Sequence, residues 1–225
     1  MSSLTWNDWL SPVWLSVKIS AVASLLVFLL GVLAAWGMTR SRLRGKSLLD
    51  TLFLLPLVLP PTVVGFLLLL LVGRQSIIGR FAEWALGHTL VFTWWAAVIA
   101  AVVMSFPLVY QTAKTGFASV DQELEASARS IGANEWQVLR YITLPLCKNA
   151  LASAFLMGFA RSLGEFGATF MVAGSIPGQT QTMPTAIYQA VESGQLPPAA
   201  YWTVAIMALS FFMLRAVGKT QKEPS

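Results

Sequence analysis

The amino-acid sequence predicts an all-α integral membrane protein with about five transmembrane helices. Of the 225 residues, 56% are hydrophobic and only 11% are charged, whereas soluble domains carry about 25% charged residues. The apolar residues gather in runs long enough to cross a bilayer, since about 20 helical residues span the hydrocarbon core. We therefore expect one membrane domain over residues 1–225, because no polar stretch is long enough to bury a core of its own.

Five apolar runs are predicted to be the spanning helices. They cover residues 13–38, 48–72, 89–110, 145–170 and 199–217. The second run contains Pro56, Pro60 and Pro61, which remove backbone donors and distort a helix. This favours a place inside the helix bundle, beside a translocation pathway. Residues 73–88 are expected to form a short polar loop. Residues 174–198 are expected to be polar and to re-enter the membrane only where protein covers them.

The basic residues predict the orientation of the chain. Lysine and arginine concentrate in cytoplasmic loops. With the N-terminus outside and the C-terminus inside, every lysine and arginine is cytoplasmic except Lys18, Arg74, Arg80 and Arg161. The formal charge of +5 is thus explained by membrane topology, with lipid rather than nucleic acid as the partner.

Composition also excludes several kinds of site. A single cysteine, Cys147, leaves no internal disulfide, and a lone His88 leaves no metal constellation. The sequence RGKS at 44–47 lacks the first glycine of a phosphate-binding P-loop, because Arg40 stands at that position. We expect no cofactor in this chain and no catalytic residues.

The longest polar stretch, residues 124–145, is predicted to form two short helices in the cytoplasm. Val120, Leu124, Ala128 and Ile131 make an apolar stripe at helical spacing. Gly132 ends or bends the first helix, and Asn134 can cap the second. Periodicity alone is equally consistent with an ordinary loop that contains some helix.

The spacing in this stretch resembles the cytoplasmic EAA signature of ABC importer permeases: Glu-Ala-Ala, three residues, Gly, nine residues, then Ile-x-Leu-Pro. The matching residues are Ser127, Ala128, Gly132, Ile142, Leu144 and Pro145. One departure is that Ala126 stands where glutamate is usual, while Glu125 lies one residue earlier, which lowers the role expected of that carboxylate.

The resemblance implies that residues 111–144 form the coupling loop that docks onto a separate ATPase subunit. The coupling residues that it implies are Glu125, Ala128, Gly132, Ala133, Ile142, Leu144 and Pro145. ATP would then be bound by the partner subunit and not by this chain.

A second group of polar residues lies in the fourth predicted span. Charged side chains in a membrane are costly, about 2.5–3.5 kcal/mol on insertion scales, and should face the bundle interior or a water-filled cavity. Arg161 and Glu165 are four residues apart and can pair. They serve either as a structural pair or as part of a pathway for an oxyanion. The candidate pathway residues are Arg161, Ser162, Gly164, Glu165, Thr169, Pro60 and Pro61.

Three segments together resemble the molybdate ABC transporter permease family: LPLVLPPTVVG, FARSLGEFGAT and PGQTQTMPTAIY. The resemblance implies type I ABC importer permease architecture in a bacterial inner membrane. It also implies a homodimer, an ATPase subunit dimer on the cytoplasmic side and an external molybdate-binding protein. Tungstate and sulfate-type oxyanion permeases stay open as alternatives.

Two other classes of membrane protein are alternatives to an ATP-driven permease. A secondary transporter driven by an ion gradient could use Arg161 and Glu165 as an ion site, but it has no need of an EAA-like docking loop. An intramembrane enzyme would need a nucleophile–base pair or a metal set, and the sequence shows neither.

Overall fold

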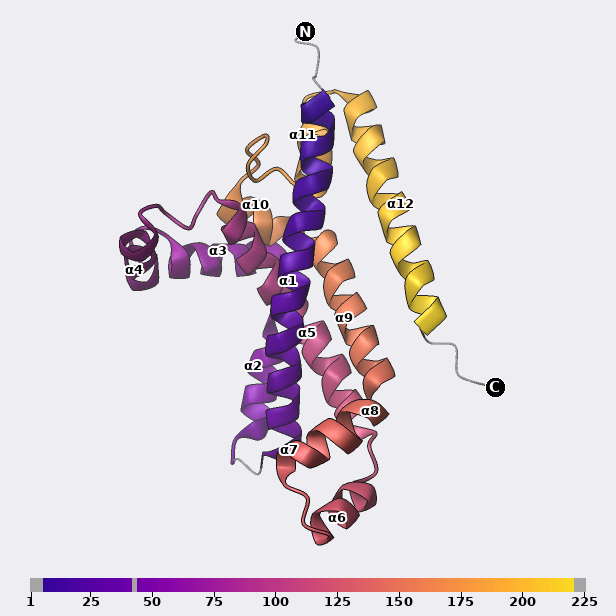
Figure 1. Ribbon diagram of the computed structural model, residues 1–225. Coiled ribbons are helices and arrows are strands. Elements are labelled where there is room, and N and C mark those ends of the chain that lie inside the picture. The colour runs from indigo at the N-terminus through magenta and orange to yellow at the C-terminus, as the bar shows by residue number, and fades with distance from the viewer. Residues whose placement is uncertain (1–5, 42–43, 221–225) are drawn as a thin grey trace.

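The computed structural model describes residues 6–41 and 44–220, and all of the regular structure in these residues is helical. The longest helix, α1 (Trp6–Arg40), runs most of the length of the molecule, and α5 (Trp94–Ala118) and α9 (Lys148–Leu163) pack against it (Figure 1). Arg42 and Lys222, which the orientation prediction counts as cytoplasmic, lie outside the described residues.

Small residues allow these three helices to approach closely. A Cβ on Gly31 of α1 would lie 2.8 Å from Val109 Cγ1 of α5, and a Cβ on Gly158 of α9 would lie 2.7 Å from Val109 Cγ2. Val109 is therefore held between two glycines from neighbouring helices. Such contacts replace the hydrophobic driving force that is missing between helices in lipid.

The second predicted span is not one helix. It consists of α2 (Lys46–Val58) and α3 (Pro61–Val72), which are bent from each other by 113°. Leu59 and Pro60 are extended because each precedes a proline, and Pro61 begins α3, where its missing N–H costs nothing. The distortion was predicted, but Pro56 lies inside α2 without ending it.

The fourth predicted span, 145–170, is interrupted by breaks. A bend of 75° separates α9 from the preceding helical turns: α7 (Glu135–Val138), a π-helical turn, η1 (Leu139–Thr143), and α8 (Leu144–Leu146). The helix α9 then ends at Leu163, and a separate short helix, α10 (Gly167–Ala173), follows. Three helices alone are long and apolar enough to span a membrane, or up to five if each bent pair is one span, among the described residues.

Two segments predicted as polar loops contain helices. The 73–88 segment forms α4 (Ile77–Leu86), which extends sideways with α3 from the bundle (Figure 1). The 174–198 segment contains α11 (Met183–Glu192), and α12 (Leu196–Thr220) begins before the predicted start of the fifth span. The Met183 N–H donates to Ser16 Oγ of α1 at 2.7 Å, so α11 is packed against the longest helix.

Candidate functional site: a docking loop and a paired helix break

The predicted cytoplasmic loop forms two short helices joined by a tight turn. The structure starts the loop after α5 ends at Ala118, later than the predicted residue 111, and then forms α6 (Gln122–Ser130). Asp121 accepts the Glu123 N–H at 2.8 Å and begins α6. Gly132 has a φ of 94°, a left-handed conformation that favours glycine. Asn134 and Gln137 form a capping box that begins α7. The prediction for Gly132 and Asn134 is confirmed.

Most of the predicted coupling residues share one exposed surface. An open groove of about 380 Å³ is lined by Ala128, Gly132, Ala133 and Ile142 together with Ile131, Gln137, Val138 and Tyr141. Ile131 is 87% exposed, and Tyr141, which lines the same groove, is exposed as well. Trp136 of α7 is also exposed. An exposed apolar cluster in a polar loop is typical of a protein-docking surface. Leu144 and Pro145 lie beyond the groove, in α8.

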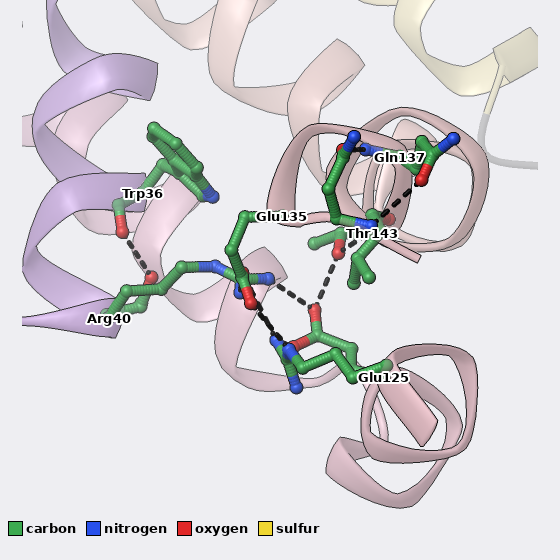
Figure 2. A network of polar contacts seen from close by, with 10 residues as sticks. Trp36, Arg40, Glu125, Glu135, Gln137 and Thr143 are labelled. Atoms are coloured by element: carbon green, nitrogen blue, oxygen red, sulfur yellow. Dashed lines mark hydrogen bonds and ion pairs between the residues drawn. The ribbon is translucent and has the colours of Figure 1, made fainter. Parts of the chain in front are cut away.

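Glu125 is not part of this groove but lies at the centre of a polar network (Figure 2). Its Oε1 accepts from Arg40 Nη2 at 2.8 Å and from Thr143 Oγ1 at 2.6 Å, and its Oε2 accepts from Arg129 Nη2 at 3.0 Å. The side chain is only 14% exposed. The shift of one residue from the usual glutamate position therefore does not make this carboxylate peripheral.

Glu135 completes the network. It accepts from Arg129 Nε at 2.7 Å and also from Arg40 Nη1. Hydrogen bonds that Arg129 donates, first to Glu135 and then to Glu125, raise the pKa of its guanidinium above the ordinary value, and the bond from Arg129 lowers the pKa of Glu135. Sequence reasoning missed Arg40 and Thr143, because both are brought to Glu125 by the fold and not by local spacing.

The second predicted cluster is assembled around Glu165. Arg161 Nη1 donates to Glu165 Oε2 at 2.6 Å, and the Ala168 N–H donates to Glu165 Oε1 at 2.9 Å. The side chain of Glu165 is 2% exposed and that of Arg161 is 26% exposed. The pairing of the two charges is confirmed, and the carboxylate also holds the start of α10 after the break at Gly164.

The remaining predicted pathway residues surround this break. Ser162 shares a buried hydrogen bond of 2.9 Å with Ser105 of α5, and Thr169 is buried in α10. A Cβ on Gly167 would lie 2.9 Å from Pro61 Cβ. The structure therefore brings the break at Pro60–Pro61 against the break between α9 and α10, although the two are about a hundred residues apart in sequence.

A comparison with protein-family models matches residues 27–219 to the binding-protein-dependent transport system inner membrane component family. The chain belongs to this family. It is an ABC importer permease, a membrane component that is not itself an enzyme.

Relatives of this permease cover nearly its whole length. It is 49% identical over 213 residues to the putative molybdenum transport system permease protein YvgM of Bacillus subtilis, covering 95% of this chain and 94% of the relative. It is 43% identical over 213 residues to the molybdenum transport system permease protein ModB of Escherichia coli K12, covering 94% and 92%.

The fold is shared with solved ABC transporters. A crystal structure of a bacterial ABC transporter involved in the import of the acidic polysaccharide alginate matches with a TM-score of 0.77 at 14% identity. The match covers 98% of this chain and 82% of that one. The predicted all-α permease architecture is confirmed.

Proposed function

We propose that this permease forms the pathway for molybdate in an ATP-driven importer of a bacterial inner membrane. The observation that carries the proposal is the loop formed by α6 and α7. A tight turn at Gly132 joins the two helices, and the residues of the EAA-like signature line an exposed apolar groove. A groove of this kind is suited to bind an ATPase subunit that is a separate polypeptide. Molybdate as the substrate is supported by the names of two relatives above 40% identity.

The proposed complex has two copies of this chain, two ATPase subunits on the cytoplasmic side and an external molybdate-binding protein. The N-terminus would lie outside, with the docking loop inside, as the basic residues favour. The paired break at Pro60–Pro61 and Gly164 would lie along the pathway. Arg161 would attract a dianion there, because a low-dielectric cavity strengthens the interaction of charges.

Reconstitution into liposomes with the cognate ATPase and binding protein tests the proposal. We expect accumulation of labelled molybdate that requires ATP and the binding protein, and that continues when ion gradients are collapsed. Uptake that persists without ATP under a clamped ion gradient would instead identify a secondary transporter. Competition by tungstate and sulfate at equal concentration then ranks the oxyanions. Stronger competition by either one than by unlabelled molybdate would overturn the assignment of substrate.

A further inference from the structure

The end of α1 reaches the docking loop through one arginine. The helices α6 and α7 pack against each other and against η1, whereas the main packing partners of α1 are α5 and α9. Arg40 is the basic residue in the last turn of α1. Resting on the proposed function, we propose that Arg40 is a positioning residue that carries movement of the docking loop to α1.

One guanidinium joins α1 to both helices of the loop. Arg40 donates through Nη2 to Glu125 of α6 and through Nη1 to Glu135 of α7. The side chain of Arg40 is 25% exposed and that of Glu125 is 14% exposed, so this charge-assisted hydrogen bond is partly shielded from water and stronger than a surface pair. The side chain of Glu135 is 57% exposed, so its bond to Arg40 is a weaker surface pair. A shift of α6 and α7 as a unit would therefore displace the end of α1.

The space around this link favours motion. A cavity of about 1090 Å³ lies beside the network and is lined by Trp36 and Arg40 of α1, Lys114 and Phe117 of α5, and Glu125 of α6, among others. Close-packed interiors resist displacement, but the Arg40 side chain that joins the loop to α1 borders this cavity. The loop can thus tilt while Arg40 stays bonded to it.

A second arginine provides a matched control. Arg129 binds the same two carboxylates, Glu125 and Glu135, but it lies in α6 itself. Losing Arg129 removes bonds within the loop, whereas losing Arg40 removes the bonds from the loop to α1. The two variants therefore separate a structural role of the network from transmission to α1.

The test compares Arg40→Gln with Arg129→Gln in the reconstituted complex with its ATPase and molybdate-binding protein. We expect Arg40→Gln to retain the ATPase subunit but to reduce stimulation of ATP hydrolysis by the loaded binding protein by roughly tenfold, within the usual range of coupling between sites. In Arg129→Gln, molybdate uptake should fall only as far as the amount of ATPase subunit bound to the permease falls. The proposal would be overturned if both variants lost the same fraction of stimulated ATP hydrolysis per bound ATPase subunit, or if Arg40→Gln kept full stimulation.

A measurement that does not depend on transport separates the role of Arg40 from the proposed function in molybdate import. Spin labels at Leu33 of α1 and Gln122 of α6 report the distance between the two helices in the permease alone. We expect Arg40→Gln to broaden this distance distribution and Arg129→Gln to leave it narrow. If Arg40→Gln does not reach the membrane, Arg40→Lys replaces it, since lysine keeps the charge but cannot hold both carboxylates in the same fork geometry. An unchanged distribution would count against Arg40 even where molybdate uptake is normal.

Discussion

The Arg161–Glu165 pair gives a quantitative test of what a charge does in this bundle. Replacing Arg161 with methionine leaves the Glu165 carboxylate without its cation at a site where its side chain is 2% exposed. Breaking a buried pair in this way costs about 3–5 kcal/mol. The Ala168 N–H still bonds to Glu165, so we expect the lower end, about 3 kcal/mol, and a fall in Tm of roughly 6–12 °C.

Substituting Glu165, alone or together with Arg161, should lower the stability of the permease less than substituting Arg161 alone. Glu165→Gln keeps an oxygen that can accept from Ala168 and leaves Arg161, which is 26% exposed, with partial access to water. We expect a cost of about 1–2 kcal/mol. In the double variant no charge is stranded, so stability should return to within about 1 kcal/mol of wild type.

Thermal unfolding of the purified permease in detergent measures these changes, with membrane abundance as a control. A double variant as unstable as Arg161→Met would refute the reasoning that the pair is stabilised by mutual charge compensation. The same double variant also tests the pathway. Molybdate uptake at matched abundance should stay slow if Arg161 attracts the ion, and should recover to the wild-type rate if the pair is only structural.

Three further predictions concern the loop, the topology and the packing of the bundle. Gly132→Asp should leave the permease inserted but unable to couple to ATP hydrolysis. A residue with a Cβ is disfavoured by about 1–2 kcal/mol at this φ, and normal stimulated ATPase activity in the variant would contradict this. Cysteines at Gln122 and Gln179, which are both exposed, should react with impermeant reagents from opposite sides of the membrane; labelling from one side would contradict the predicted orientation. Gly158→Ala should destabilise the bundle by about 1–3 kcal/mol, and Val109→Ala should relieve part of this, as thermal unfolding of the single and double variants would show.

The elements that the sequence predicts well are those governed by local pattern. The helices α1, α5 and α12 follow from long apolar runs, and the turn at Gly132 follows from its place between two polar helices. The bends could be predicted only in part. Proline explains why α2 ends near Pro60, but the angle of 113° depends on how closely α3 packs against Gly167 and Ala168 of α10.

Other features have a weak local signal or depend on the three-dimensional structure. The amphipathic spacing of Ile77, Phe81 and Trp84 was visible in the sequence and predicts α4, but the flanking polar residues favoured a loop. In the sequence, Arg40 is only one of several basic residues that indicate topology, and it occupies the position of the first P-loop glycine. Its contacts with Glu125 and Glu135, both more than eighty positions away, leave no local signal.

The length of α1 has a mechanical consequence. At 1.5 Å per residue, its 35 residues extend about 52 Å, well beyond the ~30 Å of a hydrocarbon core. Near its start, the Trp9 carbonyl accepts from Trp202 Nε1 of α12 at 3.0 Å. A rigid rod of this length acts as a lever. If it pivots at the Trp9 end, a tilt of about 5° displaces the Arg40 end by about 4 Å, roughly three quarters of a helical turn, while the hydrogen bond to α12 stays intact.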